Sequence, residues 1–289
     1  MTIATFRDIN VAYDAGQYKV ATFRKAPTQT TAQGIWFDLC MSPGNPVPNY
    51  YAATPLAWTS LKQSTDGGLA HGGNVAPLTK YLHKLLISPM AVSTVTPLPL
   101  ILLDYLGFYP FIDMADSIDL GATSLPRYTT GAGVQIMAVE VASQIGGAQF
   151  YCTYTNQDGT GGRVTQTVTC NTQTVNGTLI NTAPATAGCI GSPFLPLQIP
   201  DTGVRSVENV TFLTADVGLI TIVLVKPLAT MTIDSLSSAI YSPMEHDFAV
   251  MNGGNLPAIV DDAYLNFICL PSGTLAGGQL YGTIETIWN

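Results

Sequence analysis

Charged residues are what this 289-residue chain has least of. Asp, Glu, Lys and Arg together make up 10% of it, far below the roughly 25% of ordinary soluble domains. The formal net charge of −8 argues against nucleic-acid binding, which depends on neutralising phosphates with Lys and Arg. A hydrophobic fraction of 47% excludes a disordered chain, because disorder needs low hydrophobicity and high net charge. We expect a folded protein with a largely neutral surface that packs against something.

The few charges are unevenly placed along the chain. Residues 1–84 hold seven basic and four acidic residues, a balance of +3, whereas residues 85–289 hold four basic and fifteen acidic residues, a balance of −11. Such a split could orient the molecule on a partner, with the basic end facing an acidic surface. Chance on a sparsely charged chain explains it equally well.

The signatures of common enzymes are missing as well. The sequence contains no GxxxxGK[ST], HExxH, GxSxG or SxxK, the short motifs of P-loops, zincins and serine hydrolases. GAGVQI at 131–136 precedes a strand pattern, whereas a dinucleotide fingerprint must open a helix. HGGN at 71–74 resembles an oxyanion-hole loop, but the sequence contains no nucleophile elbow that would work with it. His71, His83 and His246 belong to no recognisable catalytic set. We therefore expect no enzyme and no cofactor.

The five cysteines show neither a CxxC pair nor the spacing of a zinc site. The chain also opens without the basic stretch and apolar segment of a secretory signal. Synthesis in the cytoplasm with reduced thiols is therefore the expectation. A Cys152–Cys170 bridge across a hairpin stays open as the alternative. The cysteines are Cys40, Cys152, Cys170, Cys189 and Cys269.

The longest apolar stretch, LPLILLDYLGFYPFIDMADSIDL at 98–120, predicts a buried central strand. A membrane helix needs about 20 apolar residues with few charges, but Asp104 and Pro110 interrupt this run, and proline breaks helices. We therefore expect no membrane span. Three aspartates at its end predict a solvated turn, with an oxygen-rich calcium site as the less favoured alternative. They are Asp113, Asp116 and Asp119.

Alternating apolar and polar residues predict strands along most of the rest. Glycines at 159, 161 and 162 predict a hairpin loop, and Pro227 is expected to end a strand because proline lacks the ladder N–H. The predicted strands cover 100–109, 134–142, the two arms of a hairpin within 148–170, 204–213, 219–225, 263–273 and 278–288.

Helical spacing is convincing in one place only, NVAPLTKYLHKLLISPM. Its apolar residues fall on one helical face between Pro77 and Pro89; they are Leu78, Tyr81, Leu82, Leu85 and Leu86. The first 60 residues are rich in Pro and Tyr and predict an extended arm with little regular structure. The sequence thus predicts an all-β protein, with an arm and one short helix over 1–89 and a jelly-roll-like β-sandwich over 90–289.

Aromatic residues gather in the proline-rich arm and around the longest apolar stretch. Tyr and Trp are enriched at subunit interfaces because they combine a large apolar body with a polar tip. Core packing explains some of them, and we predict subunit contacts for a chosen set. That set is Tyr50, Tyr51, Trp58, Tyr105, Phe108, Tyr109 and Trp288.

Several segments resemble structural proteins of tailed bacteriophages, in particular those encoded near head genes. The segments are LILLDYLGFYPFIDM, LPRYTTGAGVQIMAV, YTNQDGTGGR, GVRSVENVTFLTADVGLITIVLVKPLAT and AYLNFI, and the resemblance spans roughly residues 75–289. None of these segments has a catalytic meaning, so no functional residue is carried over.

The resemblance implies a virion component made in the host cytoplasm, most like a head decoration (cement) protein on the capsid surface. Its partners would be copies of itself, arranged as a homotrimer, and the major capsid protein. A tail, baseplate or head–tail adaptor protein is one alternative. A receptor-binding or glycan-binding module is another, because exposed loops and a neutral surface suit it.

Overall fold

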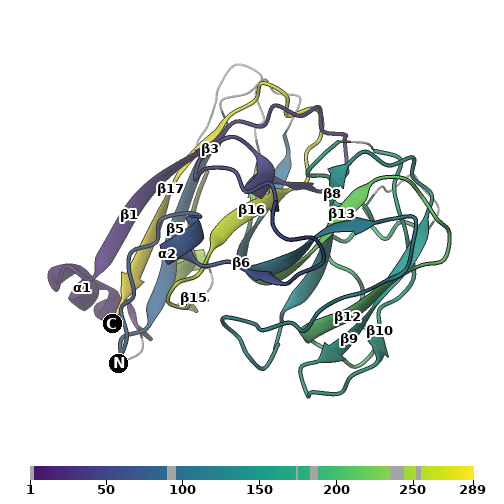
Figure 1. Ribbon diagram of the computed structural model, residues 1–289. Helices are drawn as coiled ribbons and strands as arrows, with labels where there is room; N and C mark the ends of the chain where they lie inside the picture. The colour runs from purple at the N-terminus through teal and green to yellow at the C-terminus, as the bar shows by residue number, and fades with distance from the viewer. Residues whose placement is uncertain (1–2, 90–95, 174, 183–187, 235–243, 252–254) are drawn as a thin grey trace.

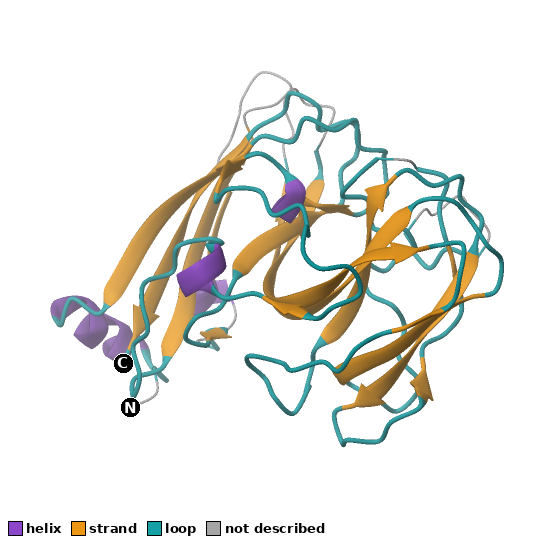
Figure 2. Cartoon of the chain, in the orientation of Figure 1, coloured by secondary structure: helices purple, strands orange, loops and turns teal. Residues whose placement is uncertain are grey.

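Antiparallel β-sheets form nearly all of the regular structure (Figures 1 and 2). The computed structural model describes residues 3–89, 96–173, 175–182, 188–234, 244–251 and 255–289. Within these ranges the helices are short: α1 (Phe6–Asp14), α2 (Gln63–Asp66), α3 (Phe248–Met251) and a 3₁₀ turn (Leu39–Met41). The all-β sandwich class is therefore confirmed, whereas the jelly-roll connectivity stays a prediction.

Sheet A contains both ends of the chain. Its strand order is β14-β5-β17-β1-β3, and β15 also pairs with β5. The C-terminal strand β17 lies between β5 and β1, so residues from the first 89 positions flank the last strand on both sides. The strands are β1 (Tyr18–Lys25), β3 (Gly44–Asn45), β5 (Lys80–Pro89), β14 (Met244–Asp247), β15 (Ala258–Ile259) and β17 (Leu280–Trp288).

Sheet B is built on two long strands, and sheet C lies beyond it. Sheet B has the order β2-β16-β6-β13-β8, with β4 also paired to β6, and sheet C has the order β10-β9-β12-β7, with β11 paired to β9. In sheet B the strands are β2 (Phe37–Asp38), β4 (Thr59–Ser60), β6 (Leu98–Asp113), β8 (Gln135–Ala142), β13 (Leu219–Ile233) and β16 (Leu265–Cys269). In sheet C they are β7 (Ile118–Asp119), β9 (Gln149–Asn156), β10 (Arg163–Val164), β11 (Val168–Thr169) and β12 (Val204–Phe212).

Sheet B lies between the other two sheets and packs against both (Figure 1). The first part of β6, Leu98–Leu102, shares a core with sheet A, and its second part, from Leu106 to Ile112, shares another with sheet C. A third core covers Leu103, Tyr105 and Phe108 with the segment 36–61. Within the described ranges no helix is long and apolar enough to cross a membrane. The apolar stretch is a buried central strand, as predicted.

The strand β13 does not end at Pro227, contrary to the expectation from its missing N–H. It runs on to Ile233, and its pairing with β6 shifts register between Pro227 and Ala229. A bulge of this kind leaves one residue out of the ladder, so the missing proline N–H is tolerated there. The long strands can therefore span both cores.

The predicted helix at 77–89 is wrong, because this segment forms the strand β5. Its pairing with β17 shifts register where Glu285 faces Lys84 and Thr286 faces Leu82, so His83 is an extra, bulged residue. The bulge changes the spacing of inward residues from two to three, and Leu82 and Leu85 are both buried. A spacing of three inside an apolar run has the same appearance as a helical face.

The first 60 residues are also more regular than predicted. Thr5 caps α1, and its hydroxyl accepts from the N–H of Asp8 while the Asp8 carboxylate accepts from Thr5, a complete capping box. The strand β1 pairs with β17 over eight residues, from Tyr18 opposite Ile287 to Lys25 opposite Leu280. The composition of this region does not indicate α1 or β1, although the Thr-x-x-Asp spacing at Thr5 signals a helix start.

Candidate interaction surface

The structure places four of the seven predicted contact residues in the interior. Tyr51, Tyr105, Phe108 and Tyr109 are at most 2% exposed. They pack together in part, since the Tyr51 and Phe108 rings lie 5.0 Å apart edge to face, an arrangement that aromatic pairs favour. These side chains are buried within a single subunit and have no surface left for a neighbouring one. The prediction that they form subunit contacts is therefore corrected: they are core residues.

Two of these tyrosines are buried because they serve a buried carboxylate. Asp38 is fully buried, and it accepts hydrogen bonds from Tyr51 Oη, from Tyr105 Oη at 2.7 Å and from the Cys40 N–H at 2.8 Å. Burial raises the pKa of Asp38, and these three donors oppose that rise. A buried carboxylate needs such donors, which explains why tyrosine is required at these positions.

We expect Tyr105→Phe to lower the free energy of unfolding by about 1–3 kcal/mol, because Asp38 would lose a donor while staying buried. Urea denaturation measures the change. Tyr81→Phe is the matched control, since Tyr81 is also buried and no hydrogen bond of its hydroxyl occurs within the described structure. Equal losses in the two variants would contradict the role given to the Tyr105 hydroxyl.

The other three predicted residues keep some exposed surface. Tyr50 is 55% exposed. Trp58 is half-buried, donates from Nε1 to the Ser124 carbonyl at 2.9 Å and lies against the Tyr109 ring. Trp288 is also partly exposed at the end of β17. For these three the contact prediction stands, and Tyr50 has the most area to offer.

The three aspartates after β6 are not brought together as metal ligands. Asp113 accepts from the Ala115 N–H at 2.9 Å, and Asp119 accepts from Asn209 Nδ2 at 2.8 Å, while Asp116 is exposed. Over the described ranges no group of three or more His, Cys, Asp or Glu residues could hold a metal ion. The arrangement agrees with the predicted solvated turn. All five cysteines are free thiols, so the Cys152–Cys170 bridge is absent.

The outer edge of β1 is an unpaired strand edge, a feature that sequence reasoning missed. The Trp288 N–H donates to the Gln17 carbonyl at 3.0 Å. Along an antiparallel strand, the main-chain N–H and C=O groups of successive residues point alternately toward the paired strand and away from it. The main-chain groups of Tyr18, Val20 and Thr22 therefore point away from β17. On that side β3 pairs only with Arg24 and Lys25. The Thr22 carbonyl accepts from Asn45 Nδ2 at 3.5 Å, and in the described part of the chain no strand pairs with the edge at Tyr18 and Val20.

Exposed apolar side chains surround this edge. Tyr18 and Val20 are 44% and 47% exposed, and Phe6 and Val11 project from the neighbouring α1 with 62% and 49% exposure. The buried side of α1 carries Ile9 and Ala12. Figure 1 shows α1 and β1 together at one end of the molecule, far from sheet C. An exposed strand edge with apolar neighbours is a template for pairing with another chain.

Strand pairing brings the basic segment 1–84 and the acidic segment 85–289 together. Lys84 on β5 lies 3.4 Å from both Glu245 and Asp247 on β14, and β1 runs beside Glu285 on β17. The basic N-terminal region and the acidic remainder therefore do not form separate bodies. Lys19 and Arg24 are exposed along β1, which makes its edge basic.

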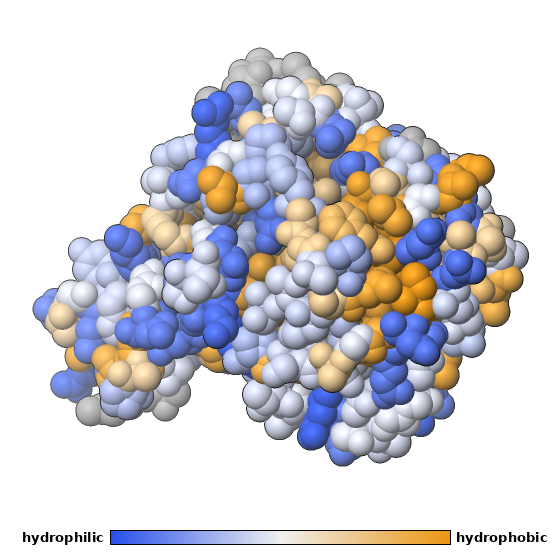
Figure 3. Space-filling model, viewed as in Figure 1, coloured by the Kyte–Doolittle hydropathy of each residue, from blue (hydrophilic) through white to orange (hydrophobic). Residues whose placement is uncertain are grey.

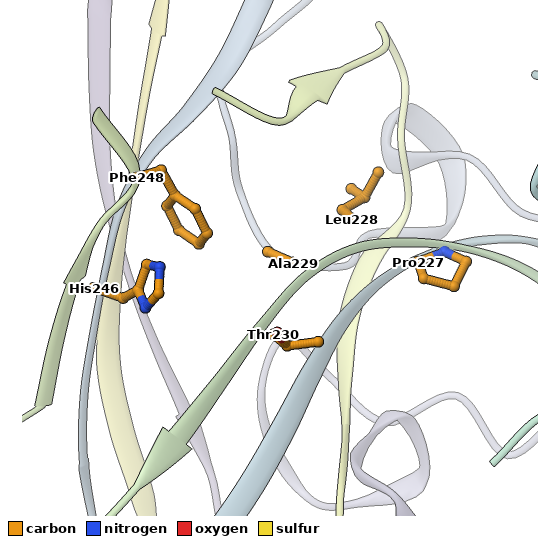
Figure 4. A pocket seen from close by; sticks show the side chains of 6 residues that line it. All are labelled: Pro227, Leu228, Ala229, Thr230, His246 and Phe248. Atoms are coloured by element: carbon orange, nitrogen blue, oxygen red, sulfur yellow. The ribbon is translucent and has the colours of Figure 1, made fainter. Parts of the chain in front are cut away.

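Two further features of the surface are less informative. Figure 3 shows apolar side chains gathered over the right-hand half of the viewed face, where sheets B and C meet. Figure 4 shows a cavity of about 300 Å³ between β13 and β14. There the His246 ring lies 4.3 Å from that of Phe248, and Leu228 and Ala229 line the opposite side. This lining is mostly apolar and brings in a single imidazole, so it offers space for an apolar group.

Comparisons with known proteins leave the family of this chain open. No protein-family model and no curated protein matches the sequence. Among solved structures, a chain from the infectious bursal disease virus Gt strain is similar at 8% identity and a TM-score of 0.15, covering 94% of this chain and 81% of that chain. A chain from T=1 particles derived from infectious bursal virus has 11% identity and a TM-score of 0.14, covering 94% and 78%. At these TM-scores the similarity supports no conclusion about the fold or the function of this chain.

Proposed function

We propose that the protein is a structural component of a virion that works by assembling with copies of itself and with a shell protein. Its likeness to phage head proteins in sequence makes a capsid decoration protein, acting as a homotrimer on the major capsid protein, the specific form of this proposal. The observation that carries it is the unpaired edge of β1 with its exposed apolar neighbours. Such an edge is suited to pairing with a strand of a neighbouring subunit.

Charge supports a second copy of the chain as the neighbour. The β1 edge presents Lys19 and Arg24, whereas residues 85–289 carry a net charge of −11. A surface from the acidic part of one subunit would therefore complement the basic edge of another. The low charge density of 10% also suits a protein whose surface is covered by neighbours.

We expect Val20→Pro to convert the assembled protein to monomers. The Val20 N–H points to the open edge, so proline removes no bond inside the subunit but blocks the addition of a strand. Size-exclusion chromatography with light scattering measures the mass, and Val20→Thr, which keeps both the branched shape and the N–H, should still assemble. A parent chain that is monomeric at all concentrations, or a Val20→Pro variant that assembles like the parent, would contradict this surface.

The virion assignment has its own test. Particles purified on a density gradient from cultures of the source should contain the chain when analysed by mass spectrometry. Antibody labelling in electron micrographs would then distinguish heads from tails. Absence of the chain from such particles would contradict a virion role, whatever its oligomeric state.

A further inference from the structure

A groove of about 500 Å³ lies where β1, α2 and the loop 70–74 meet. Its lining comes from four separate parts of the sequence and includes Lys19, Gln63, Ser64, Gly73, Asn74 and Asp262. In Figure 1 it belongs to the side of the molecule that carries β1 and α2. The groove shares Lys19 with the basic edge of β1, and its other lining residues take no part in the assembly role proposed above.

One wall of the groove offers hydrogen-bond donors. Lys80 is buried behind the loop, and its Nζ donates to the Gly73 carbonyl at 2.6 Å and to the Gly72 carbonyl at 3.5 Å. In a trans peptide the N–H points opposite to the C=O. The N–H groups of Gly73 and Asn74 therefore face away from Lys80, on residues that line the groove, and neither has an acceptor within the described residues. The exposed Lys19 adds a third donor on this wall.

The buried side of the same loop is held in one arrangement. Burial, together with the neighbouring Lys80 charge, lowers the pKa of His71 to about 4. The imidazole is therefore neutral, so its Nδ1 can accept from Lys80 Nζ at 3.1 Å while Nε2 donates to the Ala263 carbonyl at 2.8 Å. Asp261 lies 3.6 Å from Lys80 and offsets its charge. The direction of the two free N–H groups is thus set in advance.

Other lining residues offer hydrogen-bond acceptors. Asp262 has a φ of 64°, and its carboxylate accepts from the Ser64 N–H at 2.8 Å and from Ser64 Oγ at 3.0 Å. Each carboxylate oxygen has capacity for another donor. Gln63 donates from Nε2 to the Leu69 carbonyl at 3.2 Å, which leaves its Oε1 as a further acceptor. The lining of the groove therefore contains both donors and acceptors.

We propose that this groove binds a saccharide. Sugar hydroxyls donate and accept at the same time, so neighbouring hydroxyls can bond to the Asp262 carboxylate and to the Gly73 and Asn74 N–H groups. An aromatic ring also borders the donor wall, since a Cβ placed on Gly72 would lie 3.6 Å from Cζ3 of Trp288. An indole beside polar groups suits the C–H face of a sugar ring.

The chain provides a variant that fills the groove without disturbing the fold. A Cβ on Gly73 would meet no atom within 4 Å, and its φ lies outside the left-handed region, so Gly73→Val places a branched side chain in open space on the groove wall. Gly121 has the same two properties on a distant loop, which makes Gly121→Val the matched control. Lys19→Gln removes the charged donor at an exposed position.

Saturation-transfer NMR and titrations of tryptophan fluorescence on the full chain test the proposal. The probes are the methyl glycosides of glucose, galactose and N-acetylglucosamine, their trisaccharides, N-acetylneuraminic acid and inorganic phosphate. We expect at least one sugar to bind, with affinity about tenfold lower in Gly73→Val, lower in Lys19→Gln and unchanged in Gly121→Val. Tighter binding of a trisaccharide than of its monomer would identify a glycan chain as the source.

Three results would overturn the saccharide proposal. They are no response to any sugar up to about 50 mM, equal binding by the parent and Gly73→Val, and binding of phosphate alone, which would define an anion site instead. Circular dichroism of each variant confirms folding. None of these outcomes bears on the oligomeric state, so the assembly role is tested separately.

Discussion

The Glu140→Gln variant should be more stable than the parent at pH 8 and above, with a difference that shrinks as the pH falls. Glu140 lies on β8 with none of its surface exposed. Its Oε2 accepts from Gln144 Nε2 at 3.3 Å, and its Oε1 has no partner among the described residues. Burial raises the pKa of Glu140 to about 8, although the Gln144 bond acts in the other direction. The carboxyl is therefore largely protonated at neutral pH.

The sign of the effect follows from proton linkage. The folded-state pKa of Glu140 lies above the value of about 4.5 in the unfolded chain, so the folded state binds more protons between these two values. The stabilisation from the protonated form is complete below about pH 4.5 and is lost as the pH rises through 8. Each unit is worth about 1.4 kcal/mol, and glutamine, which does not titrate, removes this dependence.

Urea denaturation at pH 5, 7 and 9 measures the free energy of unfolding of each variant. The gain from Glu140→Gln over the parent should grow by several kcal/mol across this range. Glu245→Gln is the control, because the Glu245 side chain is 52% exposed and pairs with Lys84 at the surface. A difference between parent and Glu140→Gln that stays constant with pH would show that Glu140 does not titrate as its burial requires.

Strands whose residues alternate without interruption could be predicted from the sequence, and bulged strands could not. β8 lies within its predicted range of 134–142, and β9 lies within the predicted hairpin at 148–170, because two-residue periodicity is a local property. β5 was missed because the bulge at His83 is imposed by its partner β17. Pro227 likewise ends a strand in principle, yet the register shift against β6 absorbs it. In both cases the missing information lies in a strand far away in the sequence.

The candidate surface was predictable only in part, because aromatic composition does not distinguish core from surface. Tyr51 and Tyr105 are interior because Asp38, 13 and 67 residues away, needs their hydroxyls. Tyr50 is the immediate neighbour of Tyr51, yet it is 55% exposed. The open edge of β1 carries no local signal either, since an edge is defined by which strand fails to pair with it. The groove lined by Lys19 and Asp262 likewise forms only where four segments distant in the sequence meet.

We expect Arg127→Ala to be among the most destabilising single changes in the chain. The Arg127 guanidinium donates to both carboxylate oxygens of Asp104, from Nε at 2.9 Å and from Nη2 at 2.6 Å. It also donates to the carbonyls of Leu61 at 2.9 Å and Tyr105 at 3.0 Å. Asp104 is fully buried, so removing Arg127 leaves a buried carboxylate without its cation. Such a loss costs about 3–5 kcal/mol.

The pH dependence of that loss separates charge from packing. Burial raises the pKa of Asp104 to about 6, and the Arg127 hydrogen bonds hold it down. Without Arg127 the pKa rises further, and the carboxyl can become neutral by taking up a proton. The cost of Arg127→Ala should therefore be smaller at pH 5 than at pH 8. A loss that is equal at both values would indicate that the missing side-chain volume, rather than the unpaired charge, destabilises the fold.

The chain contains its own control for burial. Arg163 pairs with Asp201 at 2.8 Å, a distance close to those of the Arg127 pair, but the Arg163 side chain is 22% exposed whereas that of Arg127 is 6% exposed. Water can replace part of the Arg163 interaction, so Arg163→Ala should cost only about 0–1 kcal/mol. Thermal and urea unfolding of both variants measure the two values. Asp201 also accepts from Tyr154 Oη and Asn156 Nδ2, so a clear difference reflects both the exposure of the arginine and the donors that remain on the carboxylate. Similar losses would instead show that the Arg127 pair contributes no more than a surface ion pair.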